Sequence, residues 1–453
     1  MNNKDESSPY RVLLITICSI VILTLCYFIP EYSLKNGISL KKIDLFQDLR
    51  KIKKPVLVKP KKEIKKEFVD SCPPNIICFE DYSEKKDYLN EFYESLSNKD
   101  SVTRICFFGD SFIDADIVTS EIRNDLQIYF GGSGVGFVPI SSETNFYRRT
   151  IKHYFNGFNS HNIIHPGNKR SYLAAGGYVF TPLENNYLRY KGIKKSEKLS
   201  VFKNIRLFYK ANKTFKINYK IDHRSSSFNT KENSKIETQV INNSITKNIS
   251  FTFPPDEQLK LYGVSFEDNA GVVLDNFGMK SNSGSGLLAI PKNNWIEFNK
   301  QQDYKLIVLQ YGLNVLNKNT TNLNRYVKRM TSLVKRIQKQ CPNAKILLLG
   351  MPDRGVKIKG EITTMPNIFL MINAQRTIAK NTGIVFWDVF SAMGGVNSMK
   401  EWAERKPPLA NKDYTHLKFK GGNKLGSIFS KSLIFQYEKY LKKKDWIKKN
   451  NKQ

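Results

Sequence analysis

Cysteine is scarce in this chain of 453 residues, which has only six. Cys72 and Cys78, in the stretch SCPPNIIC, are close enough for a local disulfide in an oxidising compartment. A zinc site would need two more ligands near this pair, and none is apparent in the sequence. Cys106 lies in an apolar run and is expected to be an inert core residue.

Acidic residues are also under-represented, with 41 Asp and Glu against 72 Lys and Arg, so the net charge is +31. The lysines are scattered along the chain among many asparagines, and no RNP, zinc-finger or helix-turn-helix signature accompanies them. Compositional bias is therefore a better explanation than nucleic-acid binding, and we expect no nucleic-acid partner. Attraction to anionic lipids or to an acidic cell-wall polymer is the alternative.

A long apolar run occurs at residues 12–30, VLLITICSIVILTLCYFIP, and predicts a membrane-spanning helix. No small-x-small cleavage site follows it, and neither of its cysteines follows a small residue as a lipidated cysteine normally would, so an uncleaved signal anchor is expected. A buried soluble helix is the alternative. The flanking charges do not decide the orientation, but a single N-terminal anchor most often places the large domain outside the cytoplasm. We therefore expect an inner-membrane protein whose catalytic domain lies in the periplasm or outside the cell.

After a Lys-rich stretch that reads as an extended stalk, strands and helices alternate. RICFFG at residues 104–109 reads as a buried strand before a helical pattern, and the same alternation returns after residue 304, which favours a parallel sheet covered on both faces. The intervening residues form short β-rich runs that suggest an inserted β-sandwich, with an irregular elaboration as the alternative. The predicted segments are a cytoplasmic tip and anchor (1–34), a stalk (35–81), the first part of the α/β domain (82–146), the insert (147–273), the second part (274–443) and a basic tail (444–453).

Three short motifs carry potential chemistry, each at the expected carboxyl end of the sheet. Ser111 follows Gly109 and Asp110 at a junction from strand to helix, where its hydroxyl can stand clear of the backbone. A serine nucleophile needs a base, and in DYTH an aspartate precedes His416 by three residues, which suits an aspartate that orients an imidazole. In GLN, Asn314 follows an apolar strand and can donate to an oxyanion.

Each motif alone has an ordinary explanation as a helix cap, a surface loop or a turn. Their order and predicted structural contexts together favour catalysis. The chain has only five histidines, and the other four fall in or near the β-rich segment: His153, His161, His165 and His223. His416 is thus the histidine expected beside the serine.

At these residues the chain resembles the SGNH/GDSL hydrolase superfamily. The resemblance implies a three-layer α/β/α domain in which Ser111 attacks an ester, His416 is its base and Asp413 orients the histidine. The oxyanion hole would comprise the amide of Ser111, the side chain of Asn314 and a second-block amide. Where relatives have a glycine for that amide, this chain offers Ser281, with Gly278 and Gly284 on either side.

Further site residues and a subgroup follow from the same resemblance. Asp110 and Asp353 are expected to bind substrate, and no metal or cofactor is expected. Asp114 and Asp116 are interpreted as acids that complement a helix dipole rather than as a metal pair. GDSFIDADIVTSEIRNDL, the β-rich insert and VFWDVFSAMGG are similar to extracytoplasmic enzymes that act on O-acetyl groups of peptidoglycan or other surface glycans, in which the insert resembles a carbohydrate-binding module. Many of those enzymes have a histidine where this chain has Phe112.

The predicted function is a membrane-anchored serine esterase that removes O-acetyl groups from a cell-envelope glycan through an acyl-enzyme. The alternatives are an O-acetyltransferase of the same fold, with a membrane acyl-transfer protein as partner, and a catalytically silent glycan-binding protein. Trp402 is a candidate wall of a sugar site, whereas Trp387 follows an apolar strand and is expected in the core.

Overall fold

The computed structural model describes residues 9–28, 32–33, 39–40, 71–193 and 197–450, and the chain divides into two units between residues 67 and 68. The first unit contains helix α1 (Pro9–Tyr27) and a short antiparallel pair, β1 (Tyr32–Ser33) and β2 (Ser39–Leu40). Across the described residues, no helix is long and apolar enough to span a membrane, so the predicted anchor is not confirmed. Most of the predicted stalk, residues 41–70, lies outside the described ranges, as do residues 1–8 of the predicted tip.

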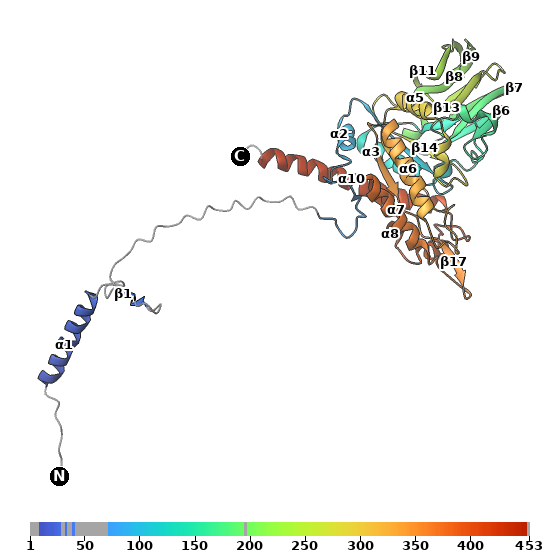
Figure 1. Cartoon of the computed structure of the whole chain (residues 1–453). Helices are drawn as coiled ribbons and strands as arrows, with labels where there is room; N and C mark the ends of the chain where they lie inside the picture. The colour runs from blue at the N-terminus through green and yellow to red at the C-terminus, as the bar shows by residue number, and fades with distance from the viewer. Residues whose placement is uncertain (1–8, 29–31, 34–38, 41–70, 194–196, 451–453) are drawn as a thin grey trace. The chain divides into compact units, whose positions relative to one another are not determined.

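The second unit is built on a six-stranded sheet whose first five strands are parallel (Figure 1). Apolar side chains fill both faces of the central strands, as in VTRICFFG and YKLIVLQ, so helices must cover the sheet on both sides. The predicted α/β fold with a parallel sheet is confirmed. In spatial order the strands are β14 (Gly271–Gly278), β4 (Val102–Gly109), β15 (Tyr304–Gln310), β16 (Lys345–Leu349), β19 (Val385–Trp387) and the antiparallel β3 (Glu80–Asp81).

The strand order reverses between β4 and β15, because the chain first adds β14 on one side of β4 and then continues on the other side. Right-handed crossovers in opposite directions place helices on opposite faces of a sheet. Accordingly α3 (Thr119–Phe130) packs on α10 (Phe419–Asn450), while α6 (Asn324–Gln340) packs on α7 (Ile368–Thr382) and α5 (Lys292–Gln302). A reversal of this kind leaves a crevice at the carboxyl ends of the strands, where open α/β sheets bind ligands.

The β-rich insert is a nine-stranded antiparallel sheet with a core of its own. It begins at β5, before residue 147, because Gly136–Pro139 pairs with β13. The expected two-sheet sandwich is instead one continuous hydrogen-bonded sheet. The reason is that β7 pairs with β12 near its end and with β13 near its start, which joins the two groups of strands. The strands are β5 (Gly136–Pro139), β6 (Ile151–Asn162), β7 (Tyr178–Gly192), β8 (Phe202–Ala211), β9 (Lys216–Ile221), β10 (Arg224–Asn229), β11 (Asn233–Thr246), β12 (Asn248–Thr252) and β13 (Leu259–Glu267).

The remaining elements are short and lie mostly in the second half of the chain. They are α2 (Asn90–Ser97), α4 (Glu197–Ser200), α8 (Val389–Met393), α9 (Ser398–Glu404), the hairpin β17 (Gly355–Ile358) and β18 (Glu361–Thr364), and the 3-10 turns Asp114–Asp116, Gly167–Tyr172 and Ser285–Ala289. Cys72 and Cys78 form a disulfide, and Cys106 is buried as predicted. Residues 444–450 of the predicted basic tail continue helix α10.

Candidate active site

Ser111 lies in the turn that follows β4, at the carboxyl end of the sheet. Gly109 allows close packing there, because a Cβ on this residue would come within 2.7 Å of the Ile113 side chain and 2.9 Å of Gln310 Oε1, and both side chains would have to shift. The next residue, Asp110, accepts a hydrogen bond from the Phe112 amide (2.9 Å), which fixes the turn. The Ser111 side chain is thereby presented at the edge of the sheet.

His416 and Asp413 lie in the loop before α10. The Ser111 Oγ and His416 Nε2 are 3.1 Å apart, and the His416 Nδ1 is 2.8 Å from Asp413 Oδ2. Helix α10 approaches the serine loop closely, since a Cβ on Gly422 would come within 2.1 Å of the Ile117 carbonyl oxygen. The structure therefore brings together the three predicted triad residues, in the geometry that lets an imidazole accept a serine proton.

Asp413 is held in its charged form. Partial burial would raise its pKa, but hydrogen bonds from the backbone and side chain of His416 and from the Thr415 amide outweigh that cost and lower the pKa. An ionised carboxylate accepts a proton from Nδ1 and leaves Nε2 free toward the serine.

The two other predicted oxyanion residues follow the neighbouring strands. Asn314, after β15, is exposed, and its Nδ2 donates to the Asn282 carbonyl oxygen at 3.2 Å. Ser281, after β14, is exposed with a φ of 59° and lines a cavity different from that of Ser111. The Met279 amide donates to the Gly109 carbonyl (3.0 Å), which fixes the loop after β14 beside the serine turn. These contacts place both residues on loops adjoining the serine, and their oxyanion roles stay predictions.

Ser111 and His416 line a cleft of about 660 Å³. Its walls come from the serine turn, from the segment between β5 and β6, and from the loop before α10. Pro407, Pro408 and Leu417 supply apolar surface. Four cationic side chains, which no sequence motif indicated, line the same cleft: Arg149, Lys280, Lys418 and Lys420. The Arg149 guanidinium lies 3.8 Å from the centre of the Phe419 ring, so a cation–π contact helps hold it at the cleft.

The two predicted substrate-binding aspartates are both fully buried, so this prediction is wrong. Asp353 accepts hydrogen bonds from the Met399 amide (2.7 Å) and the Thr364 hydroxyl (2.8 Å), and so joins α9 to the β17–β18 hairpin. Asp110 stabilises the serine turn through the hydrogen bond that it accepts from the Phe112 amide. The two tryptophans are likewise 1 % exposed, so Trp402 belongs to the core with Trp387 and not to a sugar site.

Burial raises the pKa of Asp110 to about 7 against the hydrogen bond from Phe112, which lowers it. Because the folded-state pKa exceeds the unfolded value, the folded protein binds more protons between pH 4 and 7, and stability falls as pH rises through this window. Asp110→Asn keeps the acceptor but does not titrate. Its free energy of unfolding relative to wild type should increase by about 4 kcal/mol between pH 4 and pH 8, measured by urea denaturation. A constant difference across this range would contradict a buried, titrating Asp110.

Asp116 does not complement the dipole of α3, since that helix begins at Thr119. It is 1 % exposed and forms ion pairs with Arg123 and Arg148, both at 3.0 Å. Burial alone would raise its pKa, but the two guanidinium groups lower it well below its usual range. Ala115 and Asp116 both have positive φ, so this cluster holds a strained segment between the serine and α3. Sequence reasoning missed Arg148 because nothing local marks a partner 32 residues away.

The sequence matches no protein-family model and no curated protein. Among solved structures, the fold is similar to a peptidoglycan O-acetylesterase with a TM-score of 0.63 and 20 % identity, over 80 % of this chain and 99 % of that one. A family two carbohydrate esterase from Cellvibrio japonicus aligns at 8 % identity over 66 % of this chain and 99 % of that one (TM-score 0.24). An acetyl xylan esterase aligns at 19 % identity over 35 % and 79 % (TM-score 0.26). At a TM-score of 0.63 over almost the whole of that structure, the chain shares the fold of the peptidoglycan O-acetylesterase.

Proposed function

We propose that this protein is a serine esterase that hydrolyses O-acetyl esters on an acidic cell-envelope glycan. The observation that carries the proposal is the hydrogen-bonded series of Ser111, His416 and Asp413 at the edge of an open cleft. A serine that only caps a helix, or a histidine that only packs in the core, would not be expected to line an open cleft.

The reaction follows from this geometry. His416 Nε2 accepts the Ser111 proton while Oγ forms a bond to the acetyl carbonyl carbon, and Asp413 stabilises the resulting imidazolium. As the bond from carbon to the sugar oxygen breaks, His416 returns the proton to that oxygen. Water then attacks acetyl-Ser111 with His416 again as base, which releases acetate and restores the serine. The amide of Ser111, with Asn314 and Ser281, is our proposed oxyanion hole.

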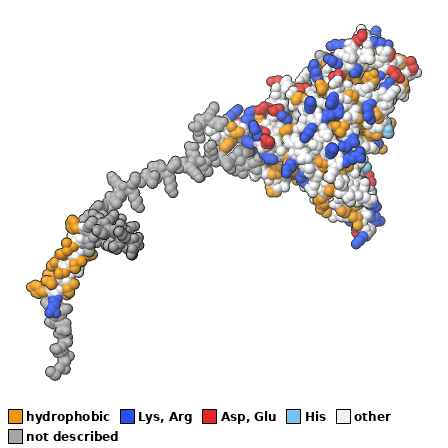
Figure 2. All heavy atoms as spheres, in the orientation of Figure 1, with side chains coloured by type: hydrophobic (Ala, Val, Ile, Leu, Met, Phe, Trp, Pro, Cys, Tyr) orange, Lys and Arg blue, Asp and Glu red, His pale blue; other side chains and the backbone are white. Residues whose placement is uncertain are grey.

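The charge of the cleft supports an acidic substrate. Among the described residues, four cationic side chains and one acid, Asp114, line it, and burial raises the pKa of that carboxyl against several hydrogen bonds and nearby cations. Basic side chains also spread over the visible face of the second unit (Figure 2). A glycan that carries carboxylates matches this surface, and the similar solved structure is a peptidoglycan O-acetylesterase.

The test is release of acetate from O-acetylated peptidoglycan by the purified protein, with Ser111 identified by mass spectrometry after reaction with a fluorophosphonate. Acetate release and a single adduct at Ser111 are expected. If the acetyl group passes to a sugar hydroxyl and no acetate appears, the protein is a transferase. If neither product forms and Ser111 is not labelled, the proposal fails.

Reversal of charge in the cleft should selectively lower the kcat/KM for acidic substrates. For Lys418→Glu/Lys420→Glu, we expect kcat/KM for acetylated glycan fragments with free carboxylates, relative to a neutral aryl acetate, to fall about tenfold. The matched control, Lys448→Glu/Lys449→Glu, makes the same charge change at exposed positions near the end of α10. An equal fall in the control would show that overall charge, and not the cleft, causes the preference.

Location outside the cytoplasm and attachment through the N-terminal helix are part of this proposal and depend on the apolar sequence of residues 12–30. A membrane acyl-transfer protein is the partner that we propose only if acetyl transfer is observed. Fractionation of cells that express the full chain, with protease accessibility of the second unit, tests the location. Recovery in the soluble cytoplasmic fraction would contradict it.

A further inference from the structure

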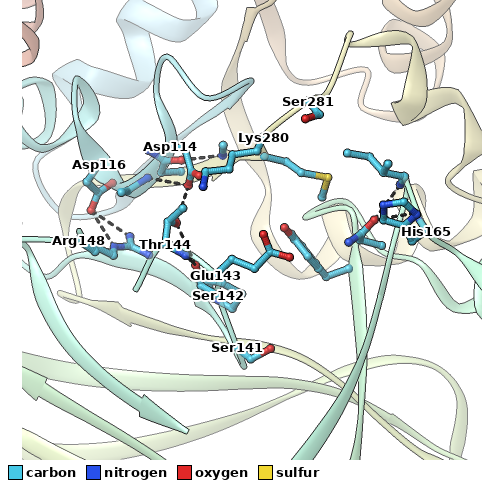
Figure 3. Close-up of a pocket in the computed structure, with 18 residues that line it drawn as sticks. Asp114, Asp116, Ser141, Ser142, Glu143, Thr144, Arg148, His165, Lys280 and Ser281 are labelled. Atoms are coloured by element: carbon cyan, nitrogen blue, oxygen red, sulfur yellow. Dashed lines mark hydrogen bonds and ion pairs between the residues drawn. The ribbon is translucent and has the colours of Figure 1, made fainter. Parts of the chain in front are cut away.

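In addition to the catalytic cleft there is a second cavity, of about 220 Å³, whose lining Figure 3 shows. The two share four lining residues, Asp114, Ala115, Thr144 and Lys280. A molecule bound at Ser111 can therefore extend past these shared residues into the second cavity.

The cavity exists only because the insert meets the catalytic domain there. One wall is the 3-10 turn Asp114–Asp116, and another is the loop after β14, residues 278–281. The insert supplies the segment between β5 and β6, with the Thr144 hydroxyl bonded to Asp114 at 3.0 Å, and also His165 after β6. The ion pair of Arg148 with Asp116 fixes the same junction. These contacts between the insert and the catalytic domain therefore fix the shape of the cavity.

Three polar side chains around the cavity are available for a ligand. Within the described part of the chain, the Glu143 carboxylate, the His165 imidazole and the Lys280 ammonium form no hydrogen bond or ion pair with a protein group, and all three residues are exposed. Figure 3 shows Glu143 and Lys280 on one side and His165 across the cavity. Tyr178, Ile164 and Met279 contribute apolar surface to the same cavity. Spaced donors and acceptors with an aromatic wall suit a ring that carries hydroxyl groups.

The charge of this cavity differs from that of the cleft. Asp116 and its two arginines together carry one positive charge, and Glu143, Asp114 and Lys280 together carry one negative charge, so no excess of cations remains. We propose that the cavity is a second subsite, which binds an uncharged sugar ring next to the acetylated residue. This inference rests on the proposed function, and it specifies the substrate as a glycan in which a neutral sugar adjoins the acetylated sugar.

The kinetic test compares an O-acetylated N-acetylhexosamine with the two disaccharides in which a second neutral sugar extends it at either end. For wild type, one disaccharide should have a kcat/KM about tenfold above that of the monosaccharide. In Glu143→Gln/His165→Ala, that ratio should fall to near one. Ser141→Trp, which fills the cavity sterically, should have the same effect.

The matched control is Glu184→Gln/His223→Ala, whose residues are exposed and line neither cavity. It should retain the wild-type ratio. If the disaccharide advantage is absent in wild type, or persists in both the double variant and Ser141→Trp, the subsite is overturned.

A binding measurement separates this inference from the esterase proposal. In full-length Ser111→Ala protein, the Kd of the favoured disaccharide, measured by calorimetry, should be about tenfold lower than that of the monosaccharide. Glu143→Gln/His165→Ala in the same background should remove the difference. If the wild type does not hydrolyse the ester but the Ser111→Ala protein shows this binding pattern, the esterase proposal is rejected and the subsite is kept. If the wild type hydrolyses the ester but the binding pattern is absent, the subsite is rejected and the esterase proposal is kept.

Discussion

Ser111→Ala should lower kcat/KM for acetyl-ester hydrolysis by about 10⁴-fold, because the only group placed to form the acyl-enzyme is removed. His416→Ala should cause a similar loss, since no other imidazole lies at the serine. Acetate release under initial-rate conditions measures both. The double variant should lose little more than either single variant, because two residues that act as a unit are strongly non-additive.

Two controls test whether the loss of activity is specific to the catalytic residues and is not caused by unfolding. Ser427→Ala, on α10 and outside both cavities, should keep wild-type activity. The urea denaturation midpoint of Ser111→Ala should match wild type, because the side chain makes a single partly buried hydrogen bond. Full hydrolysis by Ser111→Ala would reject the mechanism.

Asp116→Asn should lower the free energy of unfolding by about 3–5 kcal/mol, because it leaves two buried guanidinium groups without their charge partner. Arg123 is fully buried and Arg148 is 9 % exposed, so water cannot replace the carboxylate. Equilibrium urea denaturation at neutral pH measures the loss. The same variant should also reduce kcat, since Asp116 holds the strained segment that follows Ser111.

Asp303→Asn is the matched control for this prediction. Asp303 pairs with Lys305 at 2.8 Å, but its side chain is 60 % exposed. Asparagine also tolerates the left-handed φ of 51° at this position. A change within about 1 kcal/mol is expected for such an exposed pair. A similarly small change for Asp116→Asn would show that the buried cluster contributes little.

The local chemistry of the site could be predicted from the sequence. The buried run that ends in Gly109, the serine that follows it, and the aspartate three residues before His416 are all short-range patterns. Parallel strands bring their carboxyl ends to one edge, so a serine and an asparagine that follow two such strands must lie near each other. With only five histidines in the chain, the candidates for the base were few.

Burial and long-range pairing could not be predicted in the same way. Asp110 and Asp353 have the residue type and position of substrate ligands, yet both face the interior, where backbone amides are their partners. The expected two sheets of the insert became one because long strands exchange partners along their length. Arg148 reaches Asp116 only through the packing of the insert on the serine turn.

The α/β architecture and the three residues that the structure brings into hydrogen-bond contact, Ser111, His416 and Asp413, could thus be predicted from the sequence, because strand periodicity and i to i+3 spacing are local properties of the chain. Which acids are buried, which cations line the cleft of the serine, and the presence of a second cavity next to it follow from the packing of the folded chain. Those features depend on segments far apart in sequence, such as residues 139–148, 278–281 and 407–420, and their contacts arise when the whole chain packs.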